Sequence, residues 1–235
     1  MKKTYFNLLC AVFTAFCSCH TDEPPIAQDI EETPFTYQTS GEISGYEYVD
    51  LGLSVKWAAK NLGAENFYDS GYYFAWGEVT VKENYNWQTY TFGSTGNFTK
   101  YAQGDEDSHL KPEDDAATVN MGENWRIPTN EEIAELRENC QWQYAKVNGI
   151  IGFIVTGGNG NSIFIPASGY MSNTELKMQG KSGNFWGANI TSYDATKTAA
   201  YELLAYRSTD NSVNRYAGTI SRYYGEPIRA VSDAQ

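Results

Sequence analysis

The sequence predicts a fold of the α+β class, in which two helices accompany strands that pair as hairpins. Thr129 begins one strongly specified helix, and Pro112 begins a shorter one. The apolar run 150–155, a glycine-rich turn and the run 162–166 form a hairpin pattern. Aromatic residues make up 15% of the chain, with 18 tyrosines and 21 glycines. That composition favours strands and tight turns over a helical bundle.

The chain opens with the pattern of a secretory signal. Lys2 and Lys3 are followed by an apolar run over residues 5–16 and then by Ser18 and Cys19. The run is too short to span a bilayer, which requires about 20 apolar residues. Ser18–Cys19 resembles the end of a bacterial lipobox, so we expect residues 1–18 to be removed and Cys19 to carry lipid. Secretion without lipid is the alternative.

The next segment, residues 19–40, is acidic and interrupted by prolines. It has no periodic apolar pattern, so we expect an extended tether. Acidic residues just after a lipobox cysteine resemble the surface-export signal of Bacteroidetes lipoproteins. This resemblance implies a lipid-anchored protein of the outer membrane that faces the outside of the cell. Residues 41–235 are expected to form a single domain, which is long enough to bury one large core.

The charge and the cysteines exclude several classes of protein. The formal net charge is −12, so the chain is repelled by nucleic acid and by anionic lipid surfaces. We expect no nucleic-acid partner, and contact with a membrane only through the N-terminal lipid. Loss of the signal and lipidation of Cys19 leave Cys140 alone, so no disulfide framework is available. Cys140 is expected to be a buried hydrophobe, with a reactive nucleophile as the alternative.

Along residues 41–128 the sequence predicts strands before a short helix. Two β-rich runs flank Gly52 within 46–58, and 72–78 is an aromatic strand candidate. The polar segment 83–108 is expected to be a long exposed excursion. Residues 112–120 then predict a short helix that has acids in its first turn and Gly122 as its stop.

The stretch 125–136 carries the strongest local signal. Thr129 and Glu132 have the spacing of a capping box, in which each side chain accepts from a backbone amide of the other. Ile133, Leu136 and Cys140 then recur at helical spacing, so one apolar stripe is expected to face the core.

The remaining strands follow Cys140. The continuous apolar run 150–155 predicts a strand buried on both faces, and 162–166 is its hairpin partner across the turn 157–161. Further strands are expected at 201–206 and 228–231. Loops rich in Gly, Ser, Asn, Asp and Tyr connect them.

Several of these segments together resemble a known family, the Fibrobacter succinogenes major paralogous domain. The related Legionella collagen-like protein C-terminal domain shares much of the pattern. The matching motifs, which run in order from about residue 46 to 231, are YVDLGLSVKWA at 48–58, YFAWGE at 73–78, EDDAA at 113–117, WRIPT at 125–129 and IPASGY at 165–170.

The resemblance implies a C-type-lectin-like fold, which formylglycine-generating enzymes share. Such a fold places two helices beside twisted, mostly antiparallel sheets and carries long loops on one face. Formylglycine-generating activity would require reactive cysteines, and only Cys140 remains in the domain. The resemblance therefore implies a non-catalytic, ligand-binding domain of adhesin type.

The C-terminal third has the composition of a binding surface. Tyrosine and tryptophan give large contact areas at low entropy cost, while small polar residues supply adaptable hydrogen bonds. The candidate ligand-binding residues are Trp186, Asn189, Tyr193, Asn214, Tyr216, Arg222, Tyr223 and Tyr224. The alternative is that several aromatics, Tyr201 and Tyr206 above all, belong to the core. Related lectin-like domains include retroelement-diversified binders that vary in this region, and the expected ligand is a glycan or a cell-surface protein.

Other chemistries have weaker support. A group of acids could hold calcium through oxygen ligands: Asp105, Glu106, Asp107, Glu113, Asp114 and Asp115. A solvated loop and the start of a helix also explain these acids, so no cofactor is expected. His109 lacks partners for a transition-metal site.

A hydrolase of surface polymers is a second hypothesis for the function, and it requires two acids that converge in a pocket with one raised pKa. A structural subunit of a surface assembly is the third, and it predicts an exposed sheet edge or apolar patch.

Overall fold

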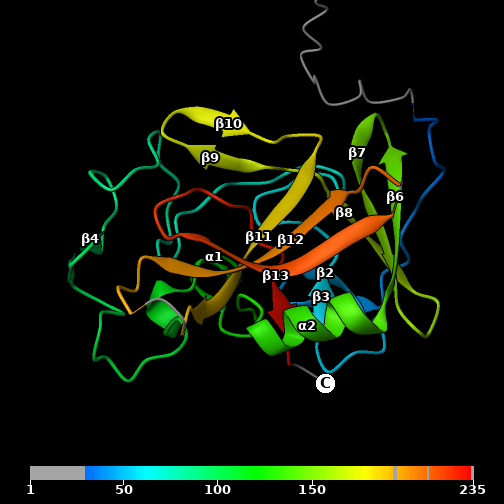
Figure 1. Ribbon diagram of the computed structural model, residues 1–235. Coiled ribbons are helices and arrows are strands. Elements are labelled where there is room, and N and C mark those ends of the chain that lie inside the picture. Colours follow the sequence, from blue (N-terminus) through cyan, green and yellow to red (C-terminus); the bar gives the residue numbers. More distant parts are fainter. Residues whose placement is uncertain (1–29, 193–194, 211, 234–235) are drawn as a thin grey trace, which may run out of the picture. The chain divides into compact units, whose positions relative to one another are not determined.

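The computed structural model describes residues 30–192, 195–210 and 212–233 (Figure 1). From Glu31 onward these residues belong to one unit. The signal segment and Cys19 lie outside the described residues, as do Tyr193, Asp194 and Asn211. The described unit is rich in antiparallel strands and contains the two expected α-helices, which confirms the α+β class.

The first sheet gathers strands from both ends of the unit, in the order β1-β2-β3-β14. Its strands are β1 (Gly41–Ile43), β2 (Tyr46–Val49), β3 (Lys56–Ala58) and β14 (Val231–Ser232). The two runs around Gly52 are thus confirmed as strands. The prediction of a strand at 228–231 was largely wrong, because β14 begins only at Val231, which pairs with Trp57.

The aromatic segment 72–78 forms no regular strand, so that prediction was wrong. Phe74 and Glu226 exchange backbone hydrogen bonds at 2.9 and 3.0 Å, an isolated bridge. The segment then turns at Gly77, whose φ is +80°. Phe74 and Trp76 are buried by residues far away in the sequence, which is why the pattern of the segment resembles that of a strand.

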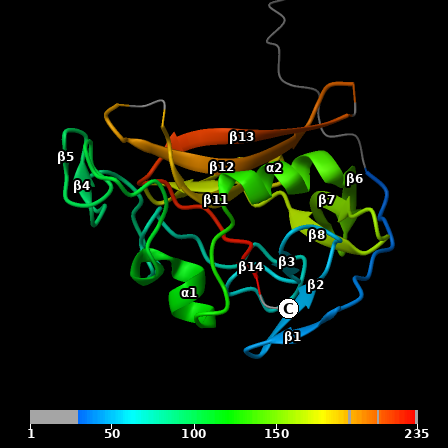
Figure 2. The same ribbon diagram turned by 90° about the horizontal axis from the view of Figure 1, so that it is seen from below.

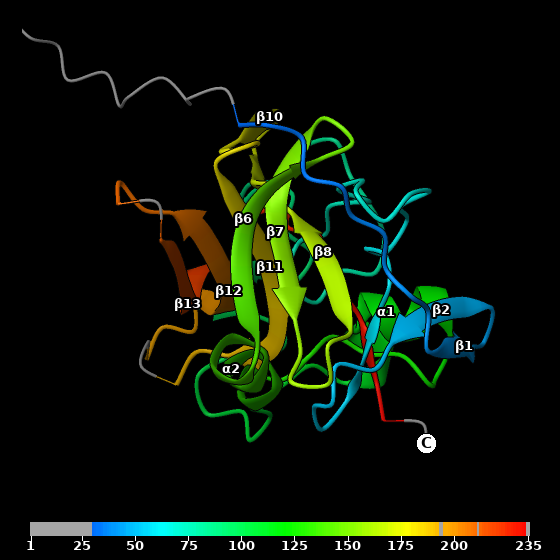
Figure 3. The same ribbon diagram turned by 90° about the vertical axis from the view of Figure 1, so that its right-hand side faces the viewer.

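The second sheet is the expected hairpin with one further strand. Its strands are β6 (Gln141–Val147), β7 (Ile150–Thr156) and β8 (Ser162–Pro166), and β7 lies between the other two (Figure 3). The middle of β7, residues 152–155, is buried, as expected of a strand covered on both faces. Gly152 in β7 has no room for a side chain, since a Cβ would lie 2.4 Å from the Ile165 carbonyl oxygen.

The third sheet consists of β11 (Ser182–Ile190), β12 (Ala199–Arg207) and β13 (Val213–Ser221), in that order. Only the 201–206 part was expected from the sequence. Figure 2 shows β13 at the outer edge of this sheet. Two small hairpins complete the strands: β4 (Gly93–Ser94) with β5 (Asn97–Phe98), and β9 (Tyr170–Ser172) with β10 (Glu175–Lys177).

The longer helix begins where the sequence places it, whereas the shorter one begins at Ala116 and not at Pro112. α2 spans Asn130–Asn139, and both bonds of the Thr129–Glu132 capping box are present. Ile133 and Leu136 are buried against the second and third sheets. A short 3-10 turn, η1 (Pro112–Asp114), leads into α1 (Ala116–Met121), which ends at Gly122.

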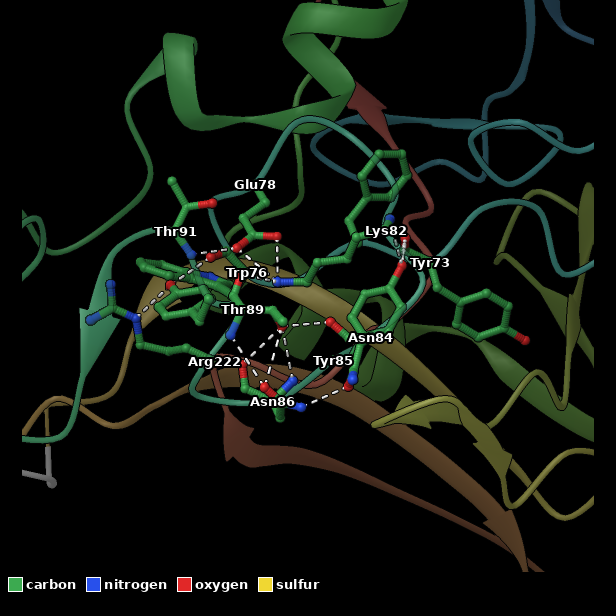
Figure 4. A network of polar contacts seen from close by, with 12 residues as sticks. Tyr73, Trp76, Glu78, Lys82, Asn84, Tyr85, Asn86, Thr89, Thr91 and Arg222 are labelled. Carbon is green, nitrogen blue, oxygen red and sulfur yellow. Dashed lines mark hydrogen bonds and ion pairs between the residues drawn. The ribbon is translucent and has the colours of Figure 1, made fainter.

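The polar segment 83–108 is not simply an exposed excursion, so this prediction was wrong for its aromatic residues. Tyr85, Tyr90, Phe92 and Tyr101 are buried in one core with Trp76, Trp125 and Trp186. The Glu78 carboxylate accepts from Lys82 Nζ at 2.9 Å and from the Thr91 amide at 2.7 Å, which ties the start of the segment to the core (Figure 4).

The last part of the expected tether packs on the unit. The Thr33 amide donates to the Lys146 carbonyl oxygen at 2.7 Å. The Phe35 ring lies 5.7 Å from that of Phe67, and Tyr37 Oη donates to Glu47 at 2.6 Å. The packed chain therefore begins near residue 31, earlier than the expected boundary at 41.

Candidate functional site

A shallow hollow of about 460 Å³ lies between the C-terminal end of α2 and the edge strand β13. It brings two of the sequence-predicted residues, Asn214 and Tyr216, next to two arginines that the sequence analysis did not select. The lining residues are Arg137, Glu138, Val213, Asn214, Arg215 and Tyr216. We refer to this site as the β13 hollow.

The register of β12 and β13 explains the placement of its aromatic side chains. Tyr206 pairs with Asn214, and Leu204 pairs with Tyr216. Side chains on paired strands repeat every second residue, so Tyr206 and Tyr216 lie diagonally on one face. Their rings are stacked, with centroids 6.0 Å apart and an interplanar angle of 24°. Tyr216 remains 47% exposed and is thus available to a ligand.

The hollow carries positive charge on a strongly acidic chain. Arg215 Nε donates to the Arg137 carbonyl oxygen at 2.8 Å, which fixes β13 to the last turn of α2. Arg137 has only a loose ion pair with Glu138, at 3.9 Å, and the Glu138 side chain is largely exposed. Strand alternation places the Arg215 side chain on the α2 side of the sheet and the Tyr216 ring on the opposite face. The two guanidinium groups favour ligands with acceptor oxygens.

Arg222 and Trp186 do not contribute to any exposed surface, contrary to the expectation that they bind ligand. Both side chains are buried. Trp186 Nε1 donates to the Phe74 carbonyl oxygen at 2.7 Å. The alternative that several aromatics belong to the core describes Trp186, whereas Tyr201 and Tyr206 are only half-buried.

The Arg222 guanidinium instead holds loops together. It donates to Tyr90 Oη at 2.9 Å and to three backbone carbonyl oxygens at 3.0–3.2 Å, and its plane covers the Phe98 ring at 4.4 Å (Figure 4). The three carbonyl groups belong to Lys100, Tyr101 and Lys197. Because these acceptors occupy its donors, Arg222 fixes the 83–108 segment rather than a ligand.

The other predicted residues lie apart from the β13 hollow. The Asn189 side chain accepts from the Asn130 amide at 2.8 Å, at the first residue of α2. Tyr223 and Tyr224 are half-buried, with ring centroids 4.3 Å apart. Tyr223 also contacts Trp87, with centroids at 4.7 Å, and burial raises its pKa. These two tyrosines form a separate aromatic cluster.

A pair of converging carboxyl groups does exist, but inside the unit. Glu202 on β12 and Glu226 are both buried. Neither Glu226 oxygen meets a hydrogen-bond donor among the described residues, and burial beside Glu202 raises the Glu226 pKa well above its usual value. A proton retained by Glu226 and donated to Glu202 satisfies both groups.

The surroundings of this pair are structural rather than catalytic. Asn184 Nδ2 donates to Glu202 at 2.7 Å, and Asn184 accepts from Ser182 Oγ at 2.6 Å. Gly218 on β13 leaves room for Glu202, since a Cβ there would lie 2.9 Å from its Oε1. Neither carboxyl group lines the β13 hollow, so a substrate in that hollow does not reach them.

The acids considered for calcium are largely bound within the unit. Asp115 caps α1 and also accepts from the Ile127 amide at 2.8 Å, while Asp114 accepts from Lys100 Nζ at 2.8 Å. Asp107 pairs with Lys111 at 2.9 Å. Across the described ranges, no group of three or more His, Cys, Asp and Glu side chains is arranged to hold a metal ion.

Cys140 lies at the end of α2 with its thiol buried. Burial raises the thiol pKa to about 11, and the nearby Glu135 adds to the shift. A thiol with a raised pKa is a poor nucleophile at neutral pH. Cys140 thus fits the expected role of a small core residue.

Compared with models of protein families, with curated proteins and with solved structures, the chain gives no match. In the part of the chain that the structure describes, neither α1 nor α2 nor any other helix has the length and apolar character needed to cross a membrane.

Proposed function

We propose that the protein is a non-catalytic, surface-exposed lipoprotein whose β13 hollow recognises a glycan or a protein on another surface. The observation that carries this proposal is the edge strand β13, which carries the exposed Tyr216 on one face and Arg215, next to Arg137 of α2, on the other. Tyrosine and arginine are residue types that are enriched in binding hot spots.

The geometry favours recognition over catalysis. The hollow is shallow and contains one carboxylate, Glu138, beside two arginines. General acid–base or nucleophilic catalysis needs a base held beside a second reactive group, and a pair of carboxylates in a pocket is one such arrangement. The buried Glu202–Glu226 pair lies elsewhere, so the hydrolase hypothesis has no support from this hollow.

The C-type-lectin-like fold and the address of the protein are parts of the same proposal. Two helices packed beside antiparallel sheets, with long connecting segments, agree with that fold class. Lipidation at Cys19, anchoring in the outer membrane and display outside the cell rest on the sequence pattern of residues 1–40. The same proposal holds that a retroelement diversifies the C-terminal region and so varies the ligand that the protein binds.

The proposal is tested by probing glycan and cell-surface-protein arrays with the purified full chain, with and without calcium. We expect reproducible binding that Tyr216→Ala weakens about 10- to 30-fold, since truncation of a central aromatic contact typically costs about 2 kcal/mol. Val81→Ala, at an exposed position outside the hollow, is the matched control. Silence on both arrays, or equal binding by wild type and Tyr216→Ala, would contradict the proposal.

A structural subunit of a surface assembly is a second candidate, favoured by one observation. Within the described residues, β13 pairs only with β12, so nine residues present a sheet edge. Edge strands of this length are templates for pairing with another chain. Sedimentation equilibrium of the full chain tests the self-assembling version: assembly that grows with concentration supports it, and a monomer at all concentrations rejects it.

A further inference from the structure

A second hollow, of about 420 Å³, lies between β2, the segment after β3 and the end of α1. Figures 2 and 3 show β2 and α1 on the side of the unit away from β13. The hollow is lined by Gly45, Tyr46, Glu47, Ala58, Lys60, Asn61, Leu62, Gly63, Ala64, Tyr72, Asn120 and Met121. We call it the Tyr46–Tyr72 hollow.

Its two tyrosines are exposed but fixed in position. Tyr46 is 40% exposed and Tyr72 is 55% exposed, both high for aromatic side chains. Tyr46 Oη donates to the Asn120 carbonyl oxygen at 3.2 Å, and the ring packs edge-on against Trp125 at 6.4 Å. The exposed rings are therefore held by contacts on one side and remain open on the other.

The Tyr72 ring packs directly against Gly63. Gly63 has a φ of +79°, and a Cβ there would lie 2.3 Å from Tyr72 Cδ2. The Tyr72 amide also donates to the Leu62 carbonyl oxygen at 2.9 Å. This close backbone contact fixes the ring before any ligand arrives, which lowers the entropy cost of binding.

The polar groups of the hollow include one loosely paired cation and anion. Lys60 Nζ lies 3.9 Å from Glu47 Oε2, and both side chains are 39% exposed. Glu47 also accepts from Tyr37 Oη at 2.6 Å. Strand alternation directs the Glu47 side chain to the face of β2 opposite Tyr46, so the pair borders the hollow and contributes no net charge.

The amide side chains of the wall are already engaged. Asn61 accepts from Arg229 Nε at 2.7 Å and donates to the Ser70 carbonyl oxygen at 2.9 Å. Asn120 Nδ2 donates to the Val79 and Ala116 carbonyl oxygens. The groups left to a ligand are therefore the two aromatic rings.

We propose that the Tyr46–Tyr72 hollow binds a neutral pyranose unit of a saccharide. A pyranose has an apolar C–H face that packs on a tyrosine ring, and its hydroxyl groups both donate and accept hydrogen bonds. The volume is at the lower end of the ~300–1,000 Å³ range of small-molecule pockets. This site is independent of the β13 hollow.

The test measures saccharide binding to the full chain by saturation-transfer NMR and titration calorimetry. The probes are methyl glycosides of glucose, galactose, mannose and N-acetylglucosamine, with their β-linked tetrasaccharides and a uronic-acid tetramer. We expect a neutral probe to bind, Tyr72→Ala to weaken it at least tenfold, and Tyr72→Phe to retain most of the affinity. Lys60→Ala is expected to weaken it to a smaller extent.

Controls separate this site from loss of folding and from the β13 hollow. Val81→Ala is the matched control at an exposed apolar position, and circular dichroism checks each variant for folding. Binding by none of the neutral probes at millimolar concentration would overturn the proposal. So would binding that Tyr216→Ala abolishes while Tyr72→Ala leaves it unchanged, because the saccharide would then occupy the β13 hollow.

Discussion

At the scale of single residues, the burial of charge distinguishes structural positions from binding positions. Arg222 and Arg229 are both fully buried, and each guanidinium donates to backbone carbonyl oxygens and to one neutral side chain. Burial lowers the pKa of Arg229 to about 9. Arg137 and Arg215, in contrast, line a surface hollow.

The Glu202–Glu226 pair gives a prediction at this scale. The folded state holds the Glu226 pKa above its unfolded value, so its protonated form favours folding. This contribution is complete below the unfolded pKa of about 4.3 and is lost as pH rises from there toward the raised pKa. We expect Glu226→Gln to stabilise the protein at neutral pH by ~1–3 kcal/mol, because the variant needs no proton, and holding one costs about 1.4 kcal/mol per pH unit above the unfolded pKa.

Urea unfolding of wild type and Glu226→Gln between pH 4 and pH 8 measures this effect. Wild-type stability should fall across that range relative to the variant, and the two should converge toward pH 4. A variant that is less stable than wild type at pH 7 would show that Glu226 is charged and paired by contacts other than Glu202.

At the scale of elements, sequence patterns that span a few residues predicted structure correctly, whereas contacts between residues far apart in the sequence could not be predicted. The Thr129–Glu132 capping box lies within four residues and predicted the start of α2 correctly. The burial of the 83–108 aromatics depends on Arg222, more than a hundred residues away. Composition alone therefore could not distinguish that segment from an exposed loop.

The candidate site shows the same limit. Composition selected residues 186–224, and two of them, Asn214 and Tyr216, line the β13 hollow. It could not separate Tyr216 from the buried Trp186, because the pairing of strands decides which side faces the core. Arg137 was missed because it lies on α2, and only folding brings it beside β13.

Asp115 links two elements and supports a prediction at this scale. Its carboxylate accepts from the Ala117 and Thr118 amides at the start of α1 and from the Ile127 amide before α2. We expect Asp115→Ala to lower the free energy of unfolding by ~2–3 kcal/mol, since it removes a helix cap and leaves a buried amide unpaired. Asp115→Asn keeps an acceptor and should cost less.

Chemical denaturation of both variants at pH 7 measures the difference. Equal stability of wild type and Asp115→Ala would contradict the assigned role of the cap. Equal losses in Asp115→Asn and Asp115→Ala would show that the negative charge matters, rather than the acceptor geometry.

At the scale of the whole unit, the two hollows lie on different sides and have different chemistry. The β13 hollow presents two arginines and an exposed tyrosine, whereas the Tyr46–Tyr72 hollow has balanced charge and two tyrosines. A domain of this kind could contact two ligands at once. Tyr216→Ala and Tyr72→Ala each change one hollow and leave the other unaltered, so the two proposed sites can be tested separately.

The most direct test of the central claim is hydrogen–deuterium exchange of the full chain with and without its strongest array ligand. Amides that a ligand covers exchange more slowly. We predict slower exchange in β13, residues 213–221, and at the end of α2 near Arg137. Unchanged exchange in β13, with protection confined to the Tyr46–Tyr72 hollow or to the aromatic cluster of Tyr223 and Tyr224, would contradict the claim that β13 forms the recognition site.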